Sequence, residues 1–210
     1  LEGPTCERFA DLAREHSIHL LLGSFNERSP WEDRCFNTSV LFGPDGSRLG
    51  VYRKIHLFDV ELPPDVFFRE SETVVPGEEI VVVGTVLGRL GLSICYDLRF
   101  SELYRELEGE GAELLTVPSA FTLTTGKDHW EPLLRARAIE NQSYVVAPAQ
   151  WGRHDDEGLR HSWGHSMIVD PWGHVVALCS EGPGIAVAEI DRDRISEIRR
   201  RLPSLEHRRL

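Results

Sequence analysis

The chain has 210 residues, of which 41% are hydrophobic and 27% are charged. These proportions are typical of a globular protein and exclude the low-apolar, highly charged composition of a disordered chain. The 34 acidic residues outnumber the 23 Lys and Arg residues, so the formal net charge is −11. This balance argues against nucleic acid as the main partner, because phosphate binding needs clustered cations. No apolar run approaches the roughly 18 residues that span a bilayer, which argues against a membrane protein.

The cysteines and the first residues lead to two further expectations. Four cysteines stand far apart and form no CxxC pair, which favours reduced thiols in a cytoplasmic protein over a disulfide framework. The first residues, Leu1-Glu2-Gly3-Pro4, have neither the features of a signal peptide nor an initiator Met. We therefore expect residues 1–210 to form a single domain within a longer polypeptide.

Hydrophobic periodicity predicts helices that alternate with strands. Helices are expected at residues 6–16, 101–108, 128–142 and 192–201. Strands are expected at residues 18–23, 37–42, 48–53, 80–85, 90–95, 113–117, 144–149, 166–169, 175–178 and 185–190. Ser101 is expected to cap its helix, and turn residues at 43–46 and 170–173 predict two hairpins.

One long segment is not periodic. Residues 61–78 hold three prolines and are expected to form a long loop of the kind that often carries function. Nothing repeats and no linker divides the chain. The pattern as a whole predicts one α/β domain with two packed sheets covered by helices.

Cys95 is the first candidate for chemistry. It ends the apolar segment 90–95, at the carboxyl end of a predicted strand. Sites collect at such strand ends, and a Cys on a tight turn there can present its sulfur beside main-chain N–H groups that stabilise an oxyanion. From position alone a buried, unreactive Cys is the more common outcome. A reactive thiolate also needs a nearby cation, because an ordinary thiol has a pKa of about 8.5.

Lys54 and Glu70 are the candidate partners of this thiol. Lys54 follows the predicted strand 48–53 and precedes the long loop, where it can supply the cation. Glu70 lies close behind two aromatic residues in that loop. Taken singly, each of these residue types is usually solvated at the surface.

Several stretches of the sequence, taken in order, resemble the nitrilase superfamily of carbon–nitrogen hydrolases, in its Nit branch. They are Tyr52-Arg53-Lys54-Ile55-His56-Leu57-Phe58-Asp59, Phe68-Arg69-Glu70-Ser71, Ile94-Cys95-Tyr96-Asp97-Leu98-Arg99-Phe100, His129-Trp130-Glu131 and Leu134-Arg135-Ala136-Arg137-Ala138-Ile139-Glu140-Asn141. Their order and spacing agree with the superfamily over nearly the whole chain.

The resemblance implies an α/β fold, a four-layer α-β-β-α sandwich of the nitrilase type. It also implies a Cys-Glu-Lys catalytic set with a second, supporting Glu. Carried over by position, Cys95 is the nucleophile, Lys54 is the lysine and Glu70 is the second carboxylate. The family's general-base Glu lies on an early strand, and no position of this sequence corresponds to it. We therefore expect the domain at 1–210 to lack its first strands and a short C-terminal tail.

Three further residues are candidates for substrate binding. The main-chain N–H of Tyr96 is suited to the oxyanion, and Phe121 follows the strand predicted beside that of Cys95. Arg99 is suited to pair with a substrate carboxylate, and Arg153 is the alternative for that role; a structural ion pair is an equally good interpretation of each arginine.

No metal or organic cofactor is needed for this chemistry. Three histidines, at positions 154, 161 and 165, lack the Cys or carboxylate spacing that would complete a metal-ligand set. The glycines between residues 84 and 91 do not form a dinucleotide-binding motif.

The sequence from residue 147 onward is similar to the deaminated glutathione amidases of this superfamily. The resemblance implies that the protein hydrolyses a small-molecule amide, deaminated glutathione, to 2-oxoglutarate and cysteinylglycine, which is a metabolite-repair reaction. It also implies that the protein is at least a homodimer. An ω-amidase that cleaves 2-oxoglutaramate, or another small-amide or carbamoyl hydrolase, is the first alternative. A catalytically inactive interaction module is the second, because the general-base Glu has no counterpart here.

Overall fold

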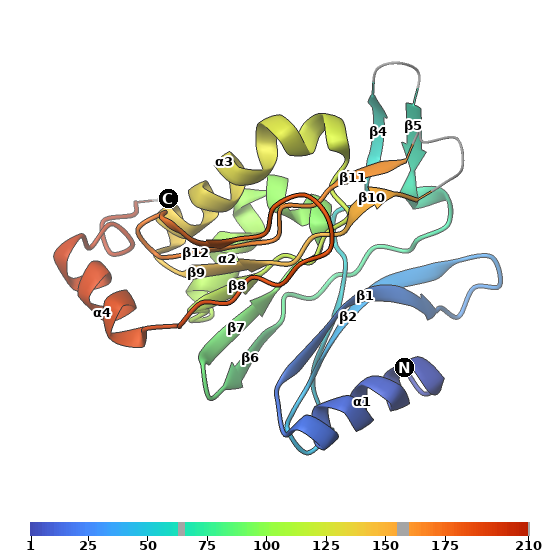
Figure 1. Ribbon diagram of the computed structural model, residues 1–210, viewed down its shortest axis with the longest axis horizontal. Coiled ribbons are helices and arrows are strands. Elements are labelled where there is room, and N and C mark those ends of the chain that lie inside the picture. Colours follow the sequence, from blue (N-terminus) through green and yellow to red (C-terminus); the bar gives the residue numbers. More distant parts are fainter. Residues whose placement is uncertain (63–65, 155–159, 210) are drawn as a thin grey trace. The chain divides into compact units, whose positions relative to one another are not determined.

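The structure is a computed structural model that describes residues 1–62, 66–154 and 160–209. It divides into two compact units, Leu1–Val83 and Gly84–Leu210 (Figure 1). Each unit combines helices with a β-sheet, which confirms the predicted α/β class.

The first unit begins with a helix and a three-stranded antiparallel sheet in the order β1-β2-β3. These elements are α1 (Pro4–His16), β1 (Leu20–Arg28), β2 (Cys35–Phe42) and β3 (Arg48–Arg53). Pro4 suits the first helical turn, where its missing N–H would have had no helical partner. β1 extends beyond the predicted 18–23 because its pairing with β2 continues through the polar residues 26–28.

The side chains of β2 point alternately to the two faces of this sheet. On one face, Val40 and Phe42 of β2 form a hydrophobic core with Cys6 and Ala13 of α1. Side chains alternate between faces along a strand, so Asn37 of β2 lies on the face opposite to α1. A polar side chain is thereby kept out of the α1 core.

Residues 59–72 form a short hairpin and a 3-10 turn. β4 (Asp59–Leu62) pairs antiparallel with β5 (Val66–Arg69), and the 3-10 helix η1 spans Glu70–Glu72. The prediction of a continuous loop at 61–78 is therefore wrong in its first half, although its residues 63–65 lie outside the described residues. The two prolines at 63 and 64 and the short strands on either side of them concealed this hairpin in the sequence pattern.

Except for the first two residues of β6, the second unit contains a six-stranded sheet in the order β13-β12-β9-β8-β7-β6. The strands are β6 (Val82–Thr85), β7 (Gly88–Leu92), β8 (Leu114–Thr116), β9 (Tyr144–Ala147), β12 (Met167–Val169) and β13 (Val175–Leu178). β7, β8 and β9 are parallel, whereas β12 is antiparallel to β9 and β13. The carboxyl ends of the three parallel strands meet at one edge, and Cys95, Phe121 and Gln150 follow those ends in the chain.

The described part of this unit also includes α2 (Ser101–Gly109), α3 (Leu123–Asn141) and α4 (Arg192–Arg201). α4 agrees with the prediction, and α3 begins earlier than the predicted residue 128. The expectation that Ser101 caps α2 is wrong, because Phe100 holds the N-cap position and makes no side-chain capping bond. A 3-10 helix, η2 (Cys95–Arg99), ends just before it and leaves Phe100 as a single extended residue between the two helices.

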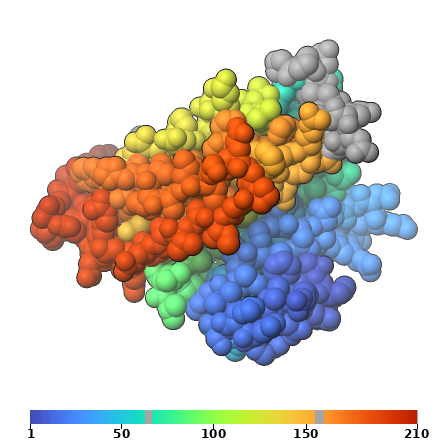
Figure 2. Space-filling model, viewed as in Figure 1, coloured from blue at the N-terminus to red at the C-terminus, as the bar shows by residue number. Residues whose placement is uncertain are grey.

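Two other predictions near the C-terminus need correction. Residues 185–190, predicted as a strand, belong to no strand of the described chain. Ile185 and Val187 are 90% and 81% exposed, and Figure 2 shows the orange-red residues of this segment on the surface of the second unit. Conversely, β10 (Trp151–Arg153) and β11 (His161–Trp163) pair antiparallel although neither was predicted. A strand needs a partner, and the local pattern does not show whether one is present.

A helix that crosses a bilayer must be long and predominantly apolar. No helix in the described residues combines sufficient length with sufficient apolar character to cross a bilayer.

Candidate active site

Lys54 and Glu70 form an ion pair within the first unit. Lys54 follows β3 and is only 2% exposed. Glu70 follows β5 and opens η1, so the hairpin of β4 and β5 returns the chain to the lysine. An unpaired buried ammonium is costly, so the two residues stabilise each other. They are therefore not solvated surface residues, which is what Lys and Glu usually are.

Three donors hold the Glu70 carboxylate. Its Oε2 accepts from Nζ of Lys54 and, at 2.6 Å, from the main-chain N–H of Phe58. Its Oε1 accepts from Nδ2 of Asn37 at 3.1 Å. With donors on both oxygens, the Glu70 carboxylate is held in place beside the lysine.

Cys95 lies in the second unit, at the turn between β7 and α2. Its φ is 51°, in the left-handed region that residues other than glycine rarely adopt. The main-chain N–H of Cys95 donates to the carbonyl of Pro118 at 3.0 Å. On the preceding residue, the N–H of Ile94 donates to Oδ2 of Asp97 at 2.8 Å. Such strain persists only where the surroundings hold it, and it is concentrated at functional sites.

A buried network supports the chain on both sides of Cys95. Arg137 of α3 donates from Nε to the carbonyl of Leu98 at 3.0 Å, and its guanidinium lies 5.4 Å from the ring centre of Tyr104. The Tyr104 hydroxyl lies 2.8 Å from Oγ of Ser93. Burial raises the pKa of Tyr104, so this hydroxyl stays neutral and suits a hydrogen-bonding role.

The three residues predicted to bind substrate lie together in the second unit. The guanidinium of Arg99 is 5.9 Å from the ring centre of Tyr96 and 5.2 Å from that of Phe121. Burial lowers the pKa of Arg99, and its closeness to Tyr96 and Cys95 opposes that shift. Arg99 is thus a half-buried cation near Cys95, whereas the alternative, Arg153, is exposed on β10.

Phe121 differs from the open cleft residue that its position predicts. It is only 4% exposed, and its ring centre lies 5.0 Å from that of Trp130. It therefore belongs to the core of the second unit while also contacting Arg99.

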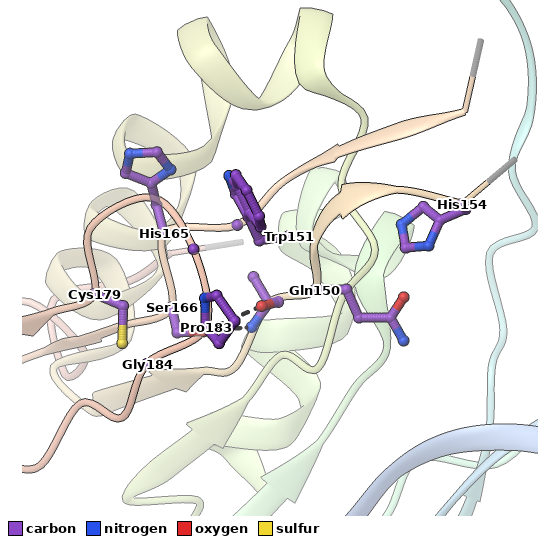
Figure 3. Close-up of a pocket in the computed structure, with 11 residues that line it drawn as sticks. Gln150, Trp151, His154, His165, Ser166, Cys179, Pro183 and Gly184 are labelled. Carbon is purple, nitrogen blue, oxygen red and sulfur yellow. Dashed lines mark hydrogen bonds between the residues drawn. The ribbon is translucent and has the colours of Figure 1, made fainter. Parts of the chain in front are cut away.

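A pocket of about 400 Å³ lies beyond the carboxyl end of β9 in the six-stranded sheet (Figure 3). Its lining combines polar and apolar side chains, including Gln150, Trp151, His154, His165, Ser166 and Cys179. His165 is fixed by its Nδ1, which lies 2.9 Å from the carbonyl of Trp163. Among the residues that the structure describes, no three His, Cys, Asp or Glu side chains are grouped to hold a metal ion.

Sequence reasoning missed one residue that contacts Glu70 and another that supports the chain after Cys95. Asn37 stands at the start of a predicted strand, although Asn is uncommon in strands. This mismatch was the feature of the sequence that could have marked Asn37 as a functional candidate. Arg137 was noted only as part of a motif, although a charged residue among the apolar positions of a helix is a comparable signal. Of the predicted residues, Lys54 and Glu70 are in direct contact, whereas Cys95 lies in the other unit.

Comparison with known proteins gives matches over the whole chain. Residues 1–200 match the family model described as carbon–nitrogen hydrolase. The chain is 50% identical over 213 residues to a deaminated glutathione amidase from Bos taurus, which covers 100% of this chain and 64% of the relative. This chain thus spans less than two thirds of the length of that relative.

Solved structures agree with this match. The crystal structure of the C. elegans NitFhit protein is 50% identical, has a TM-score of 0.91, and matches over 97% of this chain and 50% of that chain. The crystal structure of Saccharomyces cerevisiae Nit3, a member of branch 10 of the nitrilase superfamily, is 36% identical with a TM-score of 0.87, and matches over 100% of this chain and 74% of that chain. The expected nitrilase-type α/β fold is thereby confirmed.

Proposed function

Because the chain belongs to the carbon–nitrogen hydrolase family, we propose that the protein is an amidase that hydrolyses deaminated glutathione to 2-oxoglutarate and cysteinylglycine. The observation that carries the proposal is the strained backbone of Cys95, at the position that matches the family's nucleophile. The choice of substrate is supported by the 50% identity, over the whole chain, to a relative named deaminated glutathione amidase.

The proposed reaction proceeds through a thioester. Sγ of Cys95 bonds to the amide carbonyl carbon while a base takes the thiol proton, and the C–N bond then breaks as the amine leaves with a proton. Water adds to the resulting acyl-thioester and expels the thiolate, which releases 2-oxoglutarate. The family resemblance assigns the base to a Glu that has no matching position in these 210 residues.

Lys54 and Glu70 are proposed to act through charge. The Lys54 ammonium and the main-chain N–H of Tyr96 are assigned to the oxyanion of the tetrahedral intermediate, and such a donor typically contributes about 3 to 4 kcal/mol in the transition state. Glu70 keeps the lysine charged and oriented, which agrees with the donors on both of its carboxylate oxygens.

Arg99 is proposed to bind a carboxylate of the substrate, with Tyr96 and Phe121 beside it. Its half-buried guanidinium suits this role, because a charge-assisted hydrogen bond to a carboxylate is stronger where water is partly excluded. Deaminated glutathione carries carboxylates at both ends, which gives this arginine a matching partner.

The test compares two products from two substrates. Purified protein is incubated with deaminated glutathione, and the release of cysteinylglycine is measured. In a parallel reaction it is incubated with 2-oxoglutaramate, and the release of ammonia is measured. Faster cysteinylglycine release supports the proposal, whereas faster ammonia release supports the ω-amidase alternative. Activity toward neither substrate supports the inactive interaction module. Cys95→Ala must abolish any activity that is found.

We also propose a cytoplasmic homodimer or larger homo-oligomer. The four cysteines stand far apart in the sequence and form no CxxC pair, in keeping with a reducing compartment. The dimer rests on the family resemblance alone, and size-exclusion chromatography with light scattering tests it; a monomer would refute it.

A further inference from the structure

We propose that Asn37 is a positioning residue for the Lys54–Glu70 pair, because its main chain holds the lysine and its side chain holds the glutamate. This inference rests on the proposed function, in which that pair serves catalysis. Asn37 lies outside the motifs that carry the family resemblance, which begin at Tyr52.

The main chain of Asn37 fixes the point where Lys54 leaves the sheet. Thr38 pairs with Arg53, the last residue of β3. At the next pair of residues along these two segments, the N–H of Lys54 donates to the carbonyl of Asn37 at 2.8 Å. The carbonyl of Lys54 accepts in turn from the N–H of Gly77 at 2.8 Å. The main-chain N–H and C=O of Lys54 are thus both hydrogen-bonded, which fixes the backbone from which its side chain extends to Glu70.

The side chain of Asn37 fixes the plane of the Glu70 carboxylate. Lys54 and the N–H of Phe58 both donate to Oε2, whereas Nδ2 of Asn37 donates to Oε1 at 3.1 Å. The terminal torsion of a Glu side chain is intrinsically soft, so donors on one oxygen alone leave the carboxylate free to turn. A donor on the second oxygen removes that freedom and keeps Oε2 aimed at the lysine.

In the hydrogen bond between Asn37 and Glu70, the asparagine must be the donor. An ionised carboxylate can only accept hydrogen bonds, so the amide must turn its NH2 group toward Glu70. Aspartate has nearly the same size as asparagine but offers no donor when it is ionised. In Asn37→Asp two carboxyl groups would face each other, and at alkaline pH, where both are ionised, neither can donate to the other. This substitution therefore removes the donor without opening a cavity.

Asn37→Asp is the test, with Asn26→Asp as its matched control. Asn26 is the residue directly opposite Asn37 on β1 and is exposed, so the control adds the same charge to the same strand pair without removing a donor from Glu70. Hydrolysis is measured from pH 5 to pH 9. We expect kcat of Asn37→Asp to fall by about 100-fold at alkaline pH, as for other small misplacements of catalytic groups, with KM unchanged. Its activity should recover toward acid pH, whereas Asn26→Asp keeps the wild-type profile.

A second measurement does not depend on catalysis. Melting temperatures are compared for Asn37→Asp, Glu70→Gln and the double variant. Asn37→Asp should lower the melting temperature more at pH 8 than at pH 5, and adding Glu70→Gln should restore much of the loss, because a glutamine can donate to the new carboxylate. Asn37→Ser replaces Asn37→Asp if the latter does not fold, and for it kcat should fall without the recovery at acid pH.

The two measurements separate the possible failures. A wild-type protein without amidase activity would refute the proposed function, and the melting temperatures alone would then decide whether Asn37 holds Glu70. Additive changes in melting temperature, or a kcat and pH profile of Asn37→Asp that match those of Asn26→Asp, would overturn the inference.

Discussion

The main-chain N–H of Cys95 donates to the carbonyl of Pro118 at 3.0 Å, although Cys95 itself has left the extended conformation of β7 with a φ of 51°. The hydrogen-bonding pattern between β7 and β8 therefore continues past both strand ends and holds the turn that presents the thiol. This contact ties the strained backbone to the rigid sheet.

The strain at Cys95 leads to a prediction about stability. Cys95→Gly and Cys95→Ala both lack the thiol, and we expect both to be inactive. A left-handed residue other than glycine costs about 1 to 2 kcal/mol, and the greater flexibility of an unfolded glycine offsets roughly 0.5 to 1 kcal/mol of the gain. Cys95→Gly should therefore be more stable than Cys95→Ala by about 0.5 to 1 kcal/mol in urea unfolding. Equal stabilities would argue against strain at this position.

The four thiols should differ in their rates of alkylation. Burial, together with the charge of Glu70, raises the pKa of Cys35, so its reactive thiolate is scarce at neutral pH. Cys6 and Cys179 are buried, at 7% and 9% exposed. With limiting iodoacetamide at pH 7 we expect fast labelling at Cys95, observed by mass spectrometry of peptides. Loss of the fast phase in Cys35→Ala, and not in Cys95→Ala, would contradict this assignment.

Asp170 should contribute to stability against acid. Burial tends to raise its pKa, but main-chain donors from His174 and Trp172 and the side chain of Arg194 together lower the pKa below the ordinary value of 3.8. A lowered pKa stabilises the folded state above the ordinary value, and that stabilisation is lost as the pH falls through the folded value.

Two variants test this acid dependence. Asp170→Asn should lower the free energy of unfolding at pH 7 by about 1 to 3 kcal/mol, because the remaining donors lose a charged acceptor. The difference from wild type should shrink as the pH falls below the ordinary value of 3.8, as measured by urea unfolding. Asp193→Asn is the control, since Asp193 is an exposed residue of α4. A constant difference from pH 7 down to pH 3 would refute the role of the Asp170 charge.

Gly126 should be intolerant of a side chain. A Cβ at this position of α3 would lie 2.3 Å from Cβ of Trp163, which is in β11. Gly126→Ala should therefore displace the hairpin of β10 and β11 and destabilise the fold by about 1 to 3 kcal/mol. Gly109→Ala in α2 is the control, because a Cβ there meets no atom within 4 Å. Calorimetry that finds both variants equally stable would show that the hairpin is not packed against α3 as described.

Local patterns determined much of the fold. The apolar alternation and the turn residues at 43–46 and 170–173 predicted the hairpins of β2 with β3 and of β12 with β13, and the charged helix α4 was predicted at its observed bounds. These elements were predictable because their hydrogen bonds lie within one helix or between neighbouring segments of chain.

The sequence by itself determined the family and the identities of Cys95, Lys54 and Glu70 as candidates, since these depend on residue types in a fixed order. Only the tertiary structure decided that Lys54 and Glu70 meet, that Asn37 donates to the second oxygen of Glu70, and that residues 185–190 remain outside the sheet. Each of these depends on a partner distant in the sequence, and local periodicity contains no information about which distant segment will supply it.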